Sequence, residues 1–297
     1  MTGWLWAIFT VTAAGSQTLR NAMQKELTAT LGTVGATHVR FLYGLPFAAL
    51  FLLAIVLVTG QPLPSLNTPM LAWTAMGALT QIGGTALLLA AMQQRSFVVT
   101  TALSKTEPVQ VAVFGLAFLG DQITIGIAIA ILVATIGVVV MSWPKRASSE
   151  TLSLQGALLG IASGALFGLA AIGYRGGVLN AGAANFIVGA STTLVVGLVF
   201  QVALLTSYLL WRDRQTLTAL FQAWRPSMTA GFLGAFASQM WFLALAIETV
   251  AKVRTLALVE ILFAQMLSRS AFQQGLVSRE ALGIGLIVAG VILLLNT

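Results

Sequence analysis

The stretch Trp143-Pro-Lys-Arg-Ala-Ser-Ser-Glu-Thr151 divides the chain into two apolar halves. Proline, serine and charged residues are concentrated in it, which is the composition of a linker. It lies at the midpoint of the 297 residues. We therefore interpret residues 143–152 as a linker between a first repeat at 1–142 and a second repeat at 153–297.

The segments on either side of this linker are long, apolar and evenly spaced. Charged residues make up 8% of the chain and apolar residues 58%, whereas soluble domains have about 25% charged residues. A membrane-spanning helix needs about 20 mostly apolar residues, and each half contains five such segments. They are 3–24, 34–58, 69–92, 97–119, 123–142, 153–178, 184–211, 227–247, 250–271 and 279–296. The sequence therefore predicts an all-α polytopic membrane protein, one integral membrane unit of ten transmembrane helices.

Composition also excludes several classes of function. Without cysteine and with one histidine, the chain has no disulfide, thiol nucleophile or His-pair metal site, so we expect no cofactor and no metal. A net charge of +7 could indicate nucleic acid, but basic residues of polytopic proteins lie mainly in cytoplasmic loops. We expect membrane lipid and a small-molecule substrate as partners, no nucleic acid, and function as a monomer. Because the first apolar segment lacks a basic leader and contains Gln17 and Arg20, we expect a retained helix rather than a cleaved signal peptide.

Four residues of the first half recur in the second half at shifts of 153 to 157 positions. The matched pairs are Glu107 with Glu260, Gly137 with Gly290, Arg20 with Arg175, and Gly77 with Gly234. Shifts that agree within a few residues indicate two homologous halves. Because each half has an odd number of spans, the second half is inverted in the membrane, which gives a 5+5 inverted repeat typical of secondary transporters.

The motif Thr106-Glu107-Pro108 in the predicted fourth helix and Gly120-Asp121 at its end resemble the EamA branch of the drug/metabolite transporter superfamily. Within that family, the chain is similar to bacterial amino-acid exporters, including the aromatic amino-acid exporters. This sequence has Asp121 where the family often has glutamate, and Ile261 and Gln273-Gln274 where the second repeat often has Pro and Gly-Glu. The resemblance implies a transporter of the cell inner membrane and no enzymatic activity.

Three charged residues lie near the predicted midplane, Lys105 and Glu107 in the fourth helix and Glu260 in the ninth. An unpaired charge there costs about 2.5 to 3.5 kcal/mol, so such groups normally face a cavity or a partner. The functional interpretation is a binding site, and the structural alternative is a Lys-Glu pair that only holds helices together. Pro108 has no N–H, so it leaves the Ser104 carbonyl without its helical donor and favours a kink.

Further candidates for the site are amides and aromatic rings on other helices. They are Gln17 in the first helix, Gln81 in the third, and Gln239, Trp241 and Phe242 in the eighth. Aromatic walls with a few polar groups are typical of small-molecule sites, so we expect one central cavity lined by these residues with Ser104, Lys105, Glu107 and Glu260. For each glutamine, the alternative is an interhelical hydrogen bond of about 0.6 kcal/mol.

Glycines and tryptophans mark packing surfaces and helix ends. Gly156, Gly160, Gly164 and Gly168 follow a four-residue spacing that predicts close helix packing. Tryptophans near the predicted helix ends indicate interfacial belts; they are Trp4, Trp6, Trp143, Trp211 and Trp224.

These features predict a secondary transporter that exports amino acids or similar small metabolites by alternating access around a midplane cavity. The chain has no G-x-x-x-x-G-K-[ST] phosphate loop, so a substrate gradient, exchange or ion coupling would drive transport. One alternative is a transporter of other metabolites or organic cations, and another is a non-transporting scaffold or accessory subunit. An intramembrane serine protease is disfavoured because the only tempting pair, Ser104 and Lys105, occupies adjacent helix positions that point about 100° apart.

The distribution of basic residues predicts the orientation of the chain. Loops after odd-numbered spans contain or border Lys25, Arg95, Lys145, Arg146, Arg212, Arg214, Arg225, Arg269 and Arg279, and those after even-numbered spans have chiefly Arg175, Lys252 and Arg254. By the positive-inside rule both termini lie outside the cytoplasm, whereas the family resemblance implies cytoplasmic termini. Following the charges, we expect a periplasm-active reporter fused to the C-terminus to be active. Activity of a cytoplasmic reporter at the same position would contradict this orientation.

Overall fold

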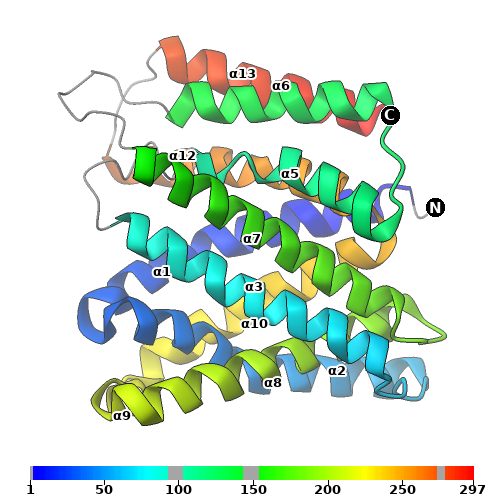
Figure 1. Ribbon diagram of the computed structural model, residues 1–297. Coiled ribbons are helices and arrows are strands. Elements are labelled where there is room, and N and C mark those ends of the chain that lie inside the picture. The colour runs from blue at the N-terminus through cyan, green and yellow to red at the C-terminus, as the bar shows by residue number, and fades with distance from the viewer. Residues whose placement is uncertain (1–2, 93–102, 143–153, 273–277) are drawn as a thin grey trace. The chain divides into compact units, whose positions relative to one another are not determined.

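The computed structural model describes residues 3–92, 103–142, 154–272 and 278–297, and these residues form helices joined by short turns (Figure 1). Five helical segments are long and apolar enough to cross a membrane: Val34–Thr59, Gly156–Leu179, Phe186–Arg212, Trp224–Ile247 and Ser278–Leu295. Each matches a predicted span, and together they identify a polytopic membrane protein. The predicted linker 143–152 and Gln273-Gln274 lie outside the described residues. The total of ten spans and the inverted repeat stay predictions.

The chain packs into two compact units. Unit 1 comprises Met1–Ala78 and Gly173–Ile247, and unit 2 comprises Leu79–Ile172 and Glu248–Thr297. The cuts fall inside α3 (Thr68–Met92), inside α7 (Leu154–Leu179) and after α10 (Trp224–Ile247). Each compact unit therefore contains residues of both predicted repeats. The predicted repeats are continuous in the sequence, whereas the compact units are not.

Unit 1 is organised around α1 (Leu5–Leu42), which packs along α10. α2 (Gly44–Thr59) and α10 both contact α8 (Phe186–Arg212). The helices approach closely at Gly231, where an added Cβ would lie 2.6 Å from the Tyr43 Cβ. His38 is fully buried and its Nε2 lies 2.9 Å from the Thr206 hydroxyl of α8. Small residues and one buried imidazole contact thus hold the first helices of the chain against the later ones.

Three local features of unit 1 differ from the prediction. Residues 25–33, expected as a loop, continue α1 up to a kink at Gly32, whose φ of 64° suits glycine. A short helix, α9 (Arg214–Gln222), fills the expected loop between the seventh and eighth spans. Asp213 caps it by accepting hydrogen bonds from the Thr216 N–H at 3.0 Å and hydroxyl at 2.7 Å. Trp6, expected at the interface, is only 5% exposed and belongs to the core.

Unit 2 contains α6 (Ile125–Ser142) and α13 (Ser278–Leu295), which lie side by side (Figure 1). Glycines on both helices allow this approach. A Cβ added at Gly137 would lie 2.8 Å from the Gly283 carbonyl oxygen, and one at Gly290 would lie 2.7 Å from the Ala134 nitrogen. Because these glycines have no side chain, the backbones of the two helices come into direct contact there.

The predicted spans 97–119 and 250–271 are interrupted rather than continuous. Residues 103–104 are helical, residues 105–106 form a turn, and α5 (Glu107–Phe114) follows with Pro108 in its first turn. The second span consists of α11 (Val250–Leu256), a 3-10 segment (Ala257–Val259) and α12 (Glu260–Phe272). Pro108 explains the first interruption because it has no N–H for the helical ladder. The second has no proline and is a tightened 3-10 turn instead.

Two glycines of the predicted packing pattern in α7, Gly164 and Gly168, contact other segments of unit 2 closely. A Cβ at Gly164 would lie 2.8 Å from the Ser104 carbonyl oxygen, and one at Gly168 would lie 2.8 Å from a methyl of Val111. The carbonyl at the interrupted helix is thus accommodated by the missing side chain of Gly164.

Substitutions at two glycines of α13 test the packing of unit 2. Gly283→Ala would bring its Cβ within 2.6 Å of the Met141 Cβ and 2.7 Å of the Gly137 carbonyl oxygen. We expect this overpacking to lower the free energy of unfolding by about 1 to 3 kcal/mol, measured by thermal unfolding in detergent. Gly285 has no heavy atom within 4 Å of the same position, so Gly285→Ala is the matched control and should leave stability unchanged or raised. Equal stability of the two variants would contradict the packing.

Candidate functional site

The two interrupted helices place a carboxylate at the start of a new helix in each case. Glu107 is the first residue of α5, and Glu260 is the first residue of α12. The positive end of the helix dipole at the start of α5 favours the negative charge of Glu107. The Glu260 N–H instead donates to the Ala257 carbonyl of the preceding 3-10 turn. At the first break, the Thr106 N–H and hydroxyl both donate to the Leu103 carbonyl, at 3.1 and 2.7 Å.

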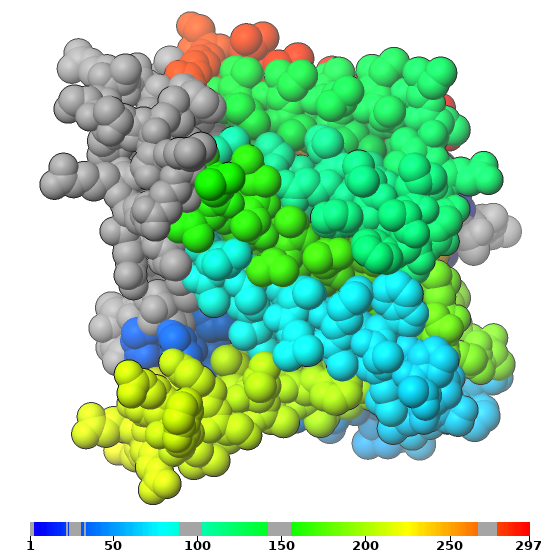
Figure 2. Space-filling view, viewed as in Figure 1, coloured from blue at the N-terminus to red at the C-terminus, as the bar shows by residue number. Residues whose placement is uncertain are grey.

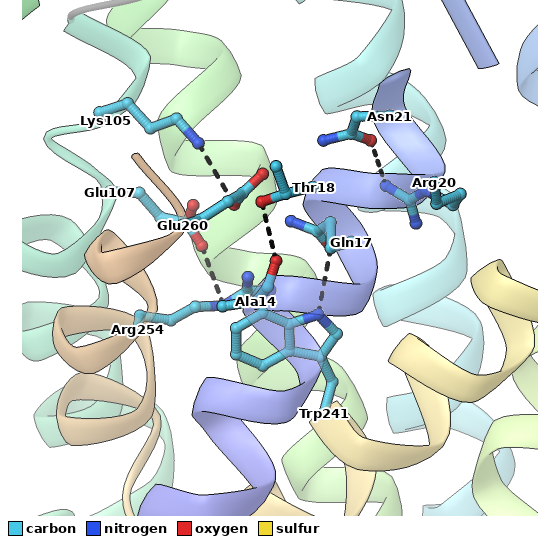
Figure 3. Close-up of polar contacts among 10 residues, drawn as sticks. All are labelled: Ala14, Gln17, Thr18, Arg20, Asn21, Lys105, Glu107, Trp241, Arg254 and Glu260. Carbon is cyan, nitrogen blue, oxygen red and sulfur yellow. Dashed lines mark hydrogen bonds and ion pairs between the residues drawn. The ribbon is translucent and has the colours of Figure 1, made fainter. Parts of the chain in front are cut away.

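Both carboxylates form ion pairs within unit 2. The Arg254 Nε lies 3.1 Å from the Glu107 Oε1, and the Lys105 Nζ lies 3.8 Å from the Glu260 Oε2 (Figure 3). Both glutamate side chains are 14% exposed, compared with 22% for Arg254 and 36% for Lys105. The Arg254–Glu107 pair is therefore the shorter and more buried of the two.

The two ion pairs cross between the same two stretches of chain. Lys105 and Glu107 belong to the predicted fourth span, and their partners Glu260 and Arg254 belong to the predicted ninth. Each span thus supplies one cation and one anion, and the four side chains have no net formal charge. Lys105 pairs with Glu260 rather than with Glu107, although Glu107 is only two residues away in the sequence.

The polar and aromatic candidates of α1 and α10 form contacts within unit 1. The Trp241 Nε1 donates to the Gln17 Oε1 at 3.1 Å, joining α10 to α1 (Figure 3). The Gln239 Nε2 donates to the Ser191 hydroxyl of α8 at 2.8 Å. Both glutamines thus make the interhelical hydrogen bonds that were the structural alternative for such residues.

An aromatic pair adjoins the same stretch of α10. The Phe242 ring lies 4.8 Å from the Tyr174 ring between centroids, in a tilted arrangement. The Tyr174 hydroxyl accepts a hydrogen bond of 2.9 Å from the Gln201 Nε2. Tyr174, Gln201, Gln239, Trp241 and Phe242 are all buried. This part of unit 1 therefore joins apolar rings to amides whose nitrogens donate hydrogen bonds, while the Gln239 Oε1 has no hydrogen-bond partner among the described residues.

The nine predicted site residues divide between the two units. Unit 1 contains Gln17, Gln239, Trp241 and Phe242, and unit 2 contains Gln81, Ser104, Lys105, Glu107 and Glu260. Ser104 is buried beside α7, and Gln81 is half-buried in α3. That all nine line one cavity stays a prediction.

Arg254 forms one of the two ion pairs although it is not among the predicted site residues. In the predicted orientation it is a loop charge, but it lies in α11 and its Nε lies 3.1 Å from the Glu107 Oε1. The available signal was its position inside an apolar span two residues after another basic residue, Lys252. Lys252 itself pairs with Glu248 at 3.8 Å, so this stretch is already charge-paired within unit 2.

Within the described ranges, histidine and carboxylate side chains form no group of three that could hold a metal ion. The site chemistry of the described residues therefore consists of carboxylate, guanidinium, ammonium, amide and aromatic groups, which bind charged and apolar parts of small molecules.

Comparisons with known proteins find one family and a fold. Residues 1–143 match the sequence model of the EamA-like transporter family, which is a family of transporters rather than enzymes. A solved structure titled "Crystal structure of protein" resembles the chain with a TM-score of 0.73 and 15% identity, covering 99% of this chain and 95% of that one. At this identity the match shows a shared fold. A search of curated proteins finds no significant match.

A double-mutant cycle on each ion pair tests their relative strength. We expect the coupling energy of Arg254→Gln with Glu107→Gln to exceed that of Lys105→Gln with Glu260→Gln, because the first pair is shorter and more buried. Its value should lie between the roughly 1 kcal/mol of exposed pairs and the roughly 3 to 5 kcal/mol lost when a fully buried pair is broken. Thermal unfolding of the four single and two double variants provides the measurement. Equal or reversed coupling energies would contradict the described geometry.

Proposed function

We propose that this chain is a secondary transporter that exports amino acids or similar small metabolites across the cell inner membrane. The observation that carries this proposal is the crossed pair of ions between the fourth and ninth spans, Lys105 with Glu260 and Arg254 with Glu107. Charged groups inside a membrane protein mark substrate or ion pathways by default, because their cost is otherwise hard to sustain. The EamA-like match over residues 1–143 supports the same class of function.

Reciprocal contacts support extending the family assignment to the second half. A Cβ added at Gly173 of the sixth span would lie 2.6 Å from the Gly77 nitrogen of the third. A Cβ added at Gly234 of the eighth span would lie 3.4 Å from the Arg20 Cδ of the first. The proposed repeat relates the first span to the sixth and the third to the eighth, so it relates these two contacts to each other.

The last two spans of each half are also related reciprocally within unit 2. Gly137 of the fifth span lies against α13, and its repeat partner Gly290 of the tenth lies against α6. In the same way, the fourth span contributes Lys105 to Glu260, and the ninth contributes Arg254 to Glu107. Contacts that exchange under the repeat support two homologous halves, 1–142 and 153–297. An inverted pair of halves is the usual framework for alternating access.

The balance of charge favours zwitterionic substrates. The four side chains of the crossed ion pairs have two positive and two negative charges, so a neutral zwitterion can bind among them without adding net charge. An organic cation or anion would leave one uncompensated charge in a medium of low dielectric, which is costly. An α-amino acid presents an ammonium and a carboxylate on one carbon. In the proposed site, one glutamate takes the ammonium, and the cation that it releases, Lys105 or Arg254, takes the carboxylate.

The remaining predicted residues complete the proposed site. As the sequence predicts, Gln81 and Ser104 supply further polar groups, and Gln17, Gln239, Trp241 and Phe242 supply amides and rings. Aromatic rings favour an apolar substrate side chain. We therefore expect apolar and aromatic amino acids to be preferred over small polar ones.

Flux into proteoliposomes tests the function and the substrate class together. The probes are phenylalanine, its methyl ester as a matched cation, and its N-acetyl derivative as a matched anion. We expect saturable flux of phenylalanine and little flux of either derivative. Flux of the ester alone would support an organic-cation transporter, and absence of flux for the twenty amino acids and the cations tested would support the scaffold alternative. The proposal is wrong in either case.

Glu107→Gln keeps the side-chain shape and removes its charge. If Glu107 binds the substrate ammonium, both gradient-driven transport and exchange between preloaded vesicles should weaken, by roughly tenfold for about 1.4 kcal/mol of lost binding. If it carries a coupling proton, gradient-driven transport should fail and exchange should survive. Glu248→Gln is the matched control, because Glu248 pairs with Lys252 four residues away and is outside the proposed site. Unchanged transport in both assays for Glu107→Gln and Glu260→Gln would remove these residues from the mechanism.

A further inference from the structure

The short helix α9 is a fixed part of unit 1 rather than a free loop. Leu220 on its inner face is fully buried, in a core cluster with Leu31 and Val39 of α1 and Leu209 of α8. The Tyr43 hydroxyl donates to the Leu220 carbonyl at 2.9 Å. These contacts hold α9 against the ends of α8 and α10, so the side chains on its outer face have a defined surface around them.

Large aromatic side chains are exposed around α9, whose yellow-green segment lies at the surface in Figure 2. Trp211, at the end of α8, is 86% exposed, Phe221 in α9 is 59% exposed, and Trp224, at the start of α10, is 52% exposed. α8 and α10 are two of the five segments long and apolar enough to cross a membrane. Aromatic rings at the ends of such helices lie at the level of the lipid headgroups.

Three exposed arginines accompany these rings. Arg212 ends α8, Arg214 begins α9, and Arg225 lies beside Trp224 with its guanidinium carbon 5.4 Å from that ring centroid. The nearby carboxylate of Asp213 accepts hydrogen bonds from the side chain and backbone of Thr216, which lower its pKa. The surface around α9 therefore has a net positive charge.

We propose that the surface formed by Trp211, Arg212, Arg214, Phe221, Trp224 and Arg225 binds the headgroups of anionic phospholipids. α9 lies in the plane of the interface, its rings enter the boundary of the acyl chains, and its arginines contact phosphate oxygens. Two observations favour lipid over a protein partner. The surface joins the ends of two apolar spans, which is where headgroups lie, and its positive charge complements an anionic leaflet.

The test measures lipid selectivity of the full-length protein in vesicles. The probes are spin-labelled phosphatidylglycerol and spin-labelled phosphatidylcholine, and the measured quantity is the ratio of their association constants with the protein. The test variant is R212Q/R214Q/R225Q. The matched control is Q215A/T218A/Q222A, which changes three exposed polar residues on or beside the same outer face and keeps the arginines. Thermal unfolding in detergent shows that both variants are folded.

We expect the wild type and the control to prefer phosphatidylglycerol, and the arginine variant to lose most of this preference. A single arginine near an anionic surface contributes up to about fivefold, and the preference should fall as salt is raised. An unchanged preference in the arginine variant would overturn the proposal, and so would an equal loss in the control. If inorganic phosphate displaces spin-labelled phosphatidylglycerol at millimolar concentration, the surface is a site for soluble anions and the proposal is wrong. If the folded wild type shows no preference, the proposal is also wrong.

Discussion

The constraint on which unit 2 depends is that a charge among apolar helices needs an opposite charge nearby. Glu107 and Glu260 satisfy it through Arg254 and Lys105, at 3.1 and 3.8 Å. Because the side chains are mostly buried, each carboxylate would be costly without its partner. The partners come from a distant part of the sequence in both cases. The two pairs therefore determine which stretches of chain lie together. Apolar contact cannot do this in a lipid environment, because lipid tails are as apolar as the helices.

The same constraint explains why the fourth and ninth spans are irregular. On an unbroken helix, Lys105 and Glu107 would point to different sides, and Glu107 would not be the first residue of a helix. The first interruption puts Glu107 at the start of α5, where the positive end of the helix dipole favours negative charge. Glu260 follows a 3-10 turn whose Ala257 carbonyl accepts its N–H. The first interruption also leaves backbone carbonyls to be accommodated, and Gly164 of α7 allows the Ser104 carbonyl to approach within 2.8 Å of the position of its absent Cβ. Charge pairing, helix interruption and glycine packing thus depend on one another.

Features that depend on many residues, such as apolar helices, could be predicted from the sequence. Features that depend on one tertiary contact could not. Apolar runs of about 20 residues located the helices, and Pro108 indicated where the fourth span breaks. The break before Glu260 has no proline, so the local sequence contained no comparable signal. α9 was missed because nine residues of mixed polarity between two spans look like a loop, and its burial depends on a tertiary contact of Leu220. Arg254 was missed because its value as a partner depends on where Glu107 lies in space.

Crossed ion pairs suit a transporter for a reason that an ordinary structural pair does not share. If the pairs served only stability, an apolar replacement of similar volume would serve as well or better, since burying charge is costly even when it is paired. Paired charges in partly exposed positions can instead exchange partners. In the proposed mechanism, the ammonium of a zwitterion takes the place of the cation beside one glutamate, and its carboxylate pairs with the cation released, Lys105 or Arg254. One internal pair therefore separates without leaving an uncompensated charge. Because the two members of each pair belong to different spans, such an exchange loosens the contact between those spans only while substrate is bound. Binding and movement would then be coupled by charge balance alone.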